Sequence, residues 1–242
     1  MKRAFIPLLL FTLMHASLAQ LSGPLSGTLG PGTYHVIDTI SVESTDTLQL
    51  MPGTTFTFDG GYPFQIYGTL LAEGTESDSI IFTTEQSDMN RWRGLRFEGA
   101  GSSGSRLGYC LIERGYAIGA SQGYRGGGIC CWNYSSPTFT NCTIRDNWAS
   151  DGGGVSCYYS SSPEFMDCTI SANLGGEVGG GVRCYESSPT FRGVHYQWQL
   201  GSVWWWGAFL GFFADLHQLH HKWQLCNVRR RGVMPLFFAD LH

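Results

Sequence analysis

A segment of about 26 residues recurs three times in this chain. The copies "GGGICCWNYSSPTFTNCTIRDN", "GGGVSCYYSSSPEFMDCTISAN" and "GGGVRCYESSPTF" begin at Gly126, Gly152 and Gly179, at offsets of 26 and 27. A fixed period of roughly 20 to 50 residues is typical of stacked units that are each too small to bury their own apolar face. The repeat therefore predicts a solenoid.

The spacing within each copy indicates strands. Apolar residues form short alternating pairs, such as Val155 with Cys157, and Gly, Ser, Pro and Asn separate these pairs. Nothing recurs at the helical period of about 3.6 residues, and propeller blades need longer units. We predict an all-β fold, a parallel β-helix of about six or seven coils over residues 20–194. Its looser early coils are expected at 47–60, 64–83, 92–99 and 105–115.

Stacked coils should place equivalent side chains in columns. Successive coils lie about 4.8 Å apart, so each residue rests on its equivalent in the next coil. Eight cysteines are present, but three thiols in one column cannot all pair, and about 4.8 Å exceeds the Cβ separation of about 3.8 Å that a disulfide prefers. We therefore expect buried free thiols. The predicted columns are Phe139, Phe165 and Phe191; Cys131, Cys157 and Cys184; and an amide ladder of Asn147 and Asn173.

Both ends of the chain differ from the repeats. Residues 1–19 have a basic start, a short apolar stretch and the small-residue pattern Ser17-Leu18-Ala19, which is typical of a secretory signal peptide. Residues 195–242 form an atypical tail that holds five of the seven histidines and five of the eight tryptophans. The tail is interpreted either as the product of a changed reading frame or as an amphipathic helical cap over the last coil. A helical metal site at His217, His220 and His221 is a third alternative.

Charge and hydropathy restrict the kinds of partner that we expect for this chain. Nine arginines and seventeen acidic residues give residues 20–194 a formal net charge of −8. An acidic surface repels phosphate, so no nucleic-acid partner is expected. The longest later apolar run, at 203–214, is shorter than the roughly 20 residues of a membrane helix, so no transmembrane span is expected.

The sequences of the predicted coils resemble those of secreted bacterial right-handed parallel β-helix proteins of the pectate-lyase-like superfamily. The resemblance covers about residues 25–194 and rests on "LQLMPGTTFTFDG", "IYGTLLAEGTESDSIIFT" and "WRGLRFEG". The later copies, with "CTIRDN" and "CTISAN", are also similar to the repeats of polymorphic outer-membrane proteins, although Ile144 and Ile170 stand where those have Phe. The resemblance implies a right-handed coil, but this superfamily includes lyases, hydrolases and adhesins.

Three groups of residues are candidates for binding. Trp92 with Arg93 could stack on a sugar ring and bind a uronate, and Asp151 and Glu177 are 26 residues apart, which suggests a stacked acidic pair. A second aromatic strip includes Tyr158 and Tyr185. The structural alternative, which we favour for each group, is a solvated turn for the acidic pair and an ordinary strand for the aromatic residues. No catalytic residue or metal site is assigned.

These observations predict an exported, non-catalytic module at a bacterial cell surface or outside the cell, acting in adhesion by binding a glycan or a surface protein. The alternative is a polysaccharide lyase or glycoside hydrolase of the pectate-lyase-like type. No cofactor is expected, except that a lyase of this kind would use Ca²⁺ held by carboxylates from adjacent coils.

Overall fold

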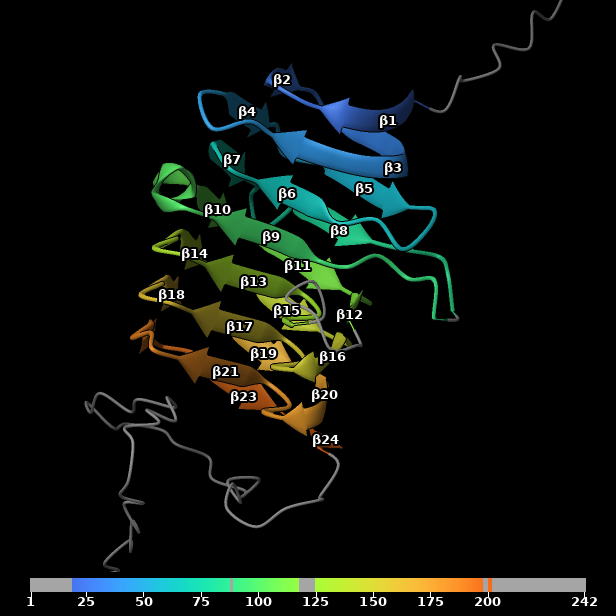
Figure 1. Cartoon of the computed structure of the whole chain (residues 1–242). Coiled ribbons are helices and arrows are strands. Elements are labelled where there is room, and N and C mark those ends of the chain that lie inside the picture. Colours follow the sequence, from blue (N-terminus) through green and yellow to red (C-terminus); the bar gives the residue numbers. More distant parts are fainter. Residues whose placement is uncertain (1–18, 88, 118–124, 198–199, 202–242) are drawn as a thin grey trace, which may run out of the picture.

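The chain winds into a stack of short strands. A computed structural model describes residues 19–87, 89–117, 125–197 and 200–201. Figure 1 shows the strands stacked as rungs from the N-terminal to the C-terminal coils. Residues 1–18 of the predicted signal peptide and nearly all of the predicted tail lie outside the described residues. The only helix in the described part is the short 3₁₀ turn η1 (Ala100–Gly104), and nothing there is long and apolar enough to cross a membrane as a helix.

Three parallel sheets form the faces of the coil. The largest has two arms that meet in β3 (Gly32–Val42), where β1 (Ala19–Pro24) also pairs. Its first arm is β6 (Phe64–Ile66), β9 (Leu95–Glu98), β13 (Ile129–Trp132), β17 (Val155–Tyr158) and β21 (Val182–Tyr185). Its second arm is β5 (Thr54–Phe58), β8 (Ile80–Thr83), β11 (Cys110–Glu113), β15 (Thr143–Arg145), β19 (Thr169–Ser171) and β23 (His195–Gln197).

The other two sheets complete each turn. One has seven strands: β2 (Gly27–Leu29), β4 (Thr47–Leu50), β7 (Thr69–Glu73), β10 (Arg106–Gly108), β14 (Thr138–Thr140), β18 (Glu164–Met166) and β22 (Thr190–Arg192). The other has four: β12 (Tyr116–Ala117), β16 (Trp148–Asp151), β20 (Leu174–Val178) and β24 (Leu200–Gly201). Seven successive strands in one sheet mean seven coils in the described residues, as the repeat predicts.

The register confirms the predicted columns. Phe139 pairs with Phe165 and Phe165 with Phe191, with ring centroids 4.7 and 5.1 Å apart and nearly parallel planes. The predicted thiol column is also present, since Cys131, Cys157 and Cys184 are register partners. All seven cysteines of the described residues are buried, and none of these seven forms a disulfide. Identical neighbours therefore explain the repeated sequence.

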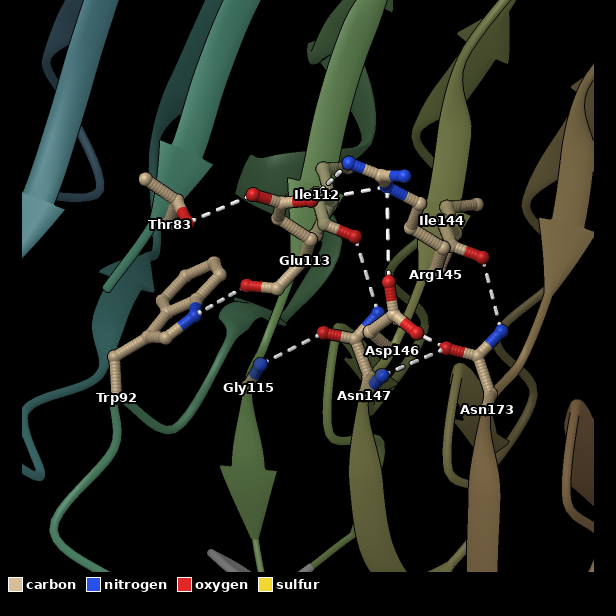
Figure 2. Close-up of polar contacts among 10 residues, drawn as sticks. All are labelled: Thr83, Trp92, Ile112, Glu113, Gly115, Ile144, Arg145, Asp146, Asn147 and Asn173. Atoms are coloured by element: carbon tan, nitrogen blue, oxygen red, sulfur yellow. Dashed lines mark hydrogen bonds and ion pairs between the residues drawn. The ribbon is translucent and has the colours of Figure 1, made fainter. Parts of the chain in front are cut away.

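The asparagine ladder joins three coils through buried amides (Figure 2). Asn147 Nδ2 donates to the carbonyl of Ile112 at 3.0 Å and to Oδ1 of Asn173 at 3.0 Å. Asn147 Oδ1 accepts the backbone N–H of Gly115 at 2.8 Å. Asn173 Nδ2 donates in turn to the carbonyl of Ile144 at 2.9 Å. Each amide thus satisfies backbone groups at a corner where the strands end.

The triple-glycine bend brings backbones too close for side chains. Gly126, Gly152 and Gly179 have φ of 62°, 61° and 68°, in the left-handed region that favours glycine. A Cβ at Gly153 would lie 2.3 Å from the carbonyl oxygen of Leu174, which is closer than real contacts allow. The bend therefore requires glycine in every copy.

The coil continues beyond the predicted boundary at residue 194. His195 pairs with Thr169 in β23, and Leu200 pairs with Leu174 in β24. Parallel pairing uses backbone groups, so the change in composition at residue 195 does not stop it. The predicted limit of the β-helix is therefore too early by at least seven residues.

Candidate functional site

The outer face of the first arm carries an aromatic column. Trp132, Tyr158 and Tyr185 are register partners on β13, β17 and β21, and their strand neighbours Cys131, Cys157 and Cys184 point into the core. Trp132 stacks on Tyr158 with centroids 5.2 Å apart, and Tyr158 stacks on Tyr185 at 5.6 Å. Alternation along each strand therefore separates an inner thiol column from this outer aromatic column.

Two arginines and one aspartate lie beside the column, and we call them the arginine bridge: Arg125, Asp151 and Arg183. Asp151 Oδ2 lies 3.5 Å from Nε of Arg125, and Asp151 Oδ1 forms an ion pair with Nη1 of Arg183. The hydroxyl of Tyr158 donates to Asp151 Oδ2 at 3.1 Å. One carboxylate thus faces two guanidinium groups, which leaves the bridge with a net positive charge.

The arginine bridge covers the centre of the aromatic column. The Arg125 guanidinium carbon lies 4.2 Å from the ring centroid of Tyr158 and 5.4 Å from that of Trp132. Arg183 approaches the Tyr158 ring at 5.7 Å. Cation–π contacts of this kind hold guanidinium groups in place over the rings. As a result Tyr158 is only 2% exposed.

Burial and charge change the acidity of the groups in this site. Burial, reinforced by the neighbouring Asp151 carboxylate, raises the pKa of Tyr158 well above its usual value, so its hydroxyl stays a donor. Burial also lowers the pKa of Arg96 and raises the pKa of the adjacent outward-facing Cys130. Arg96 donates to the carbonyl of Arg125, which links it to the arginine bridge.

Tyr159 supplies the accessible ring of the site. It is 39% exposed and stands edge-on to Trp132, with centroids 4.8 Å apart, and to Tyr185 at 5.6 Å. Its φ of 53° turns the chain at the corner after β17, so the ring projects from the bend. We call Tyr159, the aromatic column and the arginine bridge together the aromatic–arginine surface.

Three of the six candidate binding residues meet in this surface, namely Asp151, Tyr158 and Tyr185. The expected pairing of Asp151 with Glu177 is wrong, because β20 contains a one-residue register shift that places Val178 opposite Asp151. The side chain of Glu177 lies outside the described part of the chain. The offset of 27 between Gly152 and Gly179 already contained this insertion.

The expectation that Trp92 offers an exposed ring is also wrong. Trp92 is completely buried and stacks on Phe58 with centroids 4.5 Å apart, and its indole N–H donates to the carbonyl of Glu113 at 2.8 Å (Figure 2). An indole with a satisfied N–H inside the coil is a structural residue. Arg93 is exposed on the other side of the chain, as alternation predicts, but without an accessible tryptophan beside it.

Sequence reasoning missed the two arginines of the bridge. Arg125 is in register with Asp151 at an offset of 26, and Arg183 is in register with Ser156 on the outer face. Looking only for acidic residues one repeat apart overlooks the basic residue at the same offset from Asp151. Searching for opposite charges one period apart would have found Arg125.

The described residues do not gather ligands for Ca²⁺. Among residues 19–87, 89–117, 125–197 and 200–201, no group of three or more His, Cys, Asp or Glu is placed to hold a metal ion. The Asp151 carboxylate, which would be the natural ligand on the aromatic–arginine surface, already faces two guanidinium groups. Tyr158 also donates to one of its oxygens, so this carboxylate is already engaged.

The stacked parallel strands and the columns define the class as a parallel β-helix solenoid. A family model described as a right-handed beta helix region matches residues 38–197. The chain belongs to this right-handed β-helix family. A search of curated proteins found no match, and neither did a search of solved structures.

Proposed function

We propose that the protein is an exported, non-catalytic β-helix module that binds an acidic glycan on its aromatic–arginine surface, at a bacterial cell surface or outside the cell. The observation that carries this proposal is the arginine bridge, where two guanidinium groups face one carboxylate beside exposed Tyr159.

The chemistry of the surface supports an anionic sugar. A uronate carboxylate can pair with a guanidinium whose charge Asp151 only partly balances. The exposed ring of Tyr159 can pack against the apolar face of the same sugar or its neighbour. The rest of the β-helix is acidic, so this local positive charge selects where an anionic chain can bind.

The location outside the cell is supported by the N-terminal sequence. A basic start, a short apolar stretch and the small residues before Gln20 are typical of a cleaved signal peptide. Expressing the full chain in a bacterial host and sequencing the N-terminus of the exported protein tests this. We expect Gln20 first, and a chain retained in the cytoplasm with Met1 intact would contradict export.

Affinity electrophoresis in gels containing polygalacturonate tests binding. We expect the protein to be retarded, and we expect Arg125→Ala and Tyr159→Asn to weaken the binding by about tenfold each. Tyr159→Asn keeps a residue that tolerates φ of 53°, because Asn133 occupies the equivalent corner one coil earlier with the same φ.

The matched control is Arg192→Ala. Arg192 lies on β22 and forms an exposed ion pair with Glu164 at 3.6 Å, so its loss removes one positive charge away from the surface. Equal weakening by Arg192→Ala and Arg125→Ala would mean nonspecific charge attraction and would refute the site. Accumulation of unsaturated products or reducing ends from polygalacturonate would instead favour the lyase or hydrolase alternative.

A further inference from the structure

Three tyrosines project from bends that disfavour them. Tyr109, Tyr134 and Tyr159 are 37%, 66% and 39% exposed and have φ of 48°, 64° and 53°. Bulky L-residues in the left-handed region are uncommon because Cβ crowds the backbone. Tyr159 belongs to the aromatic–arginine surface. Tyr109 lies elsewhere, between β10 and β11.

Tyr109 departs from the other residues of its own column. The equivalent corner positions in the next three coils are Asn141, Asp167 and Gly193, with φ of 53°, 51° and 61°. Their equivalence is shown by the backbone N–H of Tyr109, Asn141 and Asp167, each of which donates to the coil that follows. Asn, Asp and Gly accept this conformation readily. Tyrosine is more strained there, so its exposed ring is a candidate for a role outside the fold, to be judged by what surrounds it.

Shallow grooves lie on both sides of Tyr109, which lines each of them. The larger, of about 410 Å³, crosses β8, β11 and β15 and presents Ser79, Asn141, Thr143 and Arg145. The smaller, of about 230 Å³, crosses β7, β10 and β14 and presents Glu73, Arg106, Thr138 and Thr140. An exposed aromatic ring between two grooves that combine apolar surface with hydroxyl, amide and guanidinium groups matches the needs of a sugar chain, which has apolar faces and hydroxyl edges.

The charges in these grooves are balanced. Arg106 Nε lies 3.2 Å from Glu73 Oε1. Arg145 Nη2 lies 2.7 Å from Glu113 Oε2, and Asp146 is also within reach of the same guanidinium (Figure 2). Each arginine is therefore matched by at least one carboxylate, unlike the arginines of the bridge. A carboxylate on a ligand would meet no excess positive charge here.

We propose that the Tyr109 corner is a second, separate binding site that takes a neutral glycan. The Tyr109 ring packs against one sugar, and adjoining sugars lie in the two grooves, where paired arginine and glutamate side chains bind hydroxyl groups. This site lies at the corner between the seven-stranded sheet and the second arm, whereas the aromatic–arginine surface lies on the first arm. The proposal does not depend on the acidic-glycan site.

A glycan microarray tests it. The array carries unsubstituted β-glucan, xylan, mannan and galactan oligosaccharides together with oligogalacturonate. We expect the protein to bind at least one neutral series, and Tyr109→Asn to weaken that binding by about tenfold or more. Binding of oligogalacturonate should be unchanged in this variant.

Misfolding cannot explain such a loss. Tyr109→Asn places at the corner the residue that the next coil uses there, so its melting temperature should equal or exceed that of the parent protein. Tyr134→Asn, at a corner of the coil away from both grooves, is the matched control and should retain neutral-glycan binding.

Two results would overturn the proposal. One is an array on which no neutral oligosaccharide binds, and the other is a Tyr109→Asn variant that binds the neutral series as the parent does. If either result occurred while Arg125→Ala lost oligogalacturonate binding, the Tyr109 site would be refuted and the acidic-glycan site would still be supported.

Discussion

Removing the amide of Asn147 should destabilise the β-helix more than its single side chain suggests. Its Oδ1 accepts from Gly115 at 2.8 Å, and its Nδ2 donates to Ile112 at 3.0 Å and to Asn173 at 3.0 Å, all in buried surroundings (Figure 2). Asn147→Ala removes all three hydrogen bonds. At about 1 kcal/mol each, the free energy of unfolding should fall by about 3 kcal/mol.

Urea denaturation followed by circular dichroism measures this loss. A slope of about 1 to 3 kcal/mol per molar urea converts it into a midpoint lower by about 1 M or more. Asn133→Gly is the control, because Asn133 is exposed and glycine accepts its φ of 53°. The control should change stability by less than about 0.5 kcal/mol.

The comparison has a clear negative outcome. If Asn147→Ala lost less than about 1 kcal/mol, or no more than the control, the buried amide would contribute no more than an average surface residue. The ladder would then not join the coils energetically, and the reason for its repetition would be lost.

Three other predictions concern the phenylalanine column, the buried thiols and the phenol of Tyr158. Phe165→Ala should cost about 3 to 5 kcal/mol in urea denaturation because it opens a cavity between Phe139 and Phe191, whereas Phe165→Leu should cost clearly less, and equal losses would refute the stacked core. Cys226 is the eighth cysteine and lies outside the described residues, so it is replaced by serine in the next test. In Cys226→Ser, the seven remaining thiols should not react with Ellman's reagent until urea unfolds the protein. Immediate reaction would contradict their burial. The raised pKa of Tyr158 means that its phenol ionises in the folded protein only above the pH at which an unfolded tyrosine does. The unfolded state therefore loses this proton first, stability falls as pH rises above about 10, and Tyr158→Phe should reduce that fall in alkaline denaturation.

The sequence predicts the coils well where they repeat. Three copies with equivalent Phe139, Phe165 and Phe191 determine both the period and the inward face, because each residue meets its own equivalent in the stack. The asparagine ladder follows from the same logic. Even in the looser coil at 105–115, "YCLI" at 109–112 lies in register with the similar "NCTI" at 141–144.

Prediction fails where a segment has no copy to align with. Trp92 lies between β8 and β9, in a stretch whose sequence resembles no segment of the later coils, so only composition suggested its role. Its burial depends on Phe58 on β5 and Phe82 on β8, which are adjacent strands of the second arm. Such contacts are set by the stack as a whole and leave no local pattern.

The site itself depends on the exact register. One inserted residue in β20 separates Asp151 from Glu177, and the cross-coil pairing of Arg125 with Asp151 brings in a basic residue instead. An error of one residue in the offset therefore predicts an acidic pair where the structure has a bridge with a net positive charge. The columns can be predicted despite an error of one residue in the offset, but the residues that meet in a binding site cannot.

Distances along one column test the stacked coil most directly. Gln49, Glu164 and Thr190 belong to one register line through β4, β7, β10, β14, β18 and β22, with four coil steps from Gln49 to Glu164 and five to Thr190. Spin labels on a genetically encoded keto amino acid avoid the native thiols. Pulsed electron resonance should give narrow distributions centred near about 19 Å and about 24 Å, differing by one coil spacing of about 4.8 Å. Equal distances, or broad distributions without this increment, would contradict a single stack of coils.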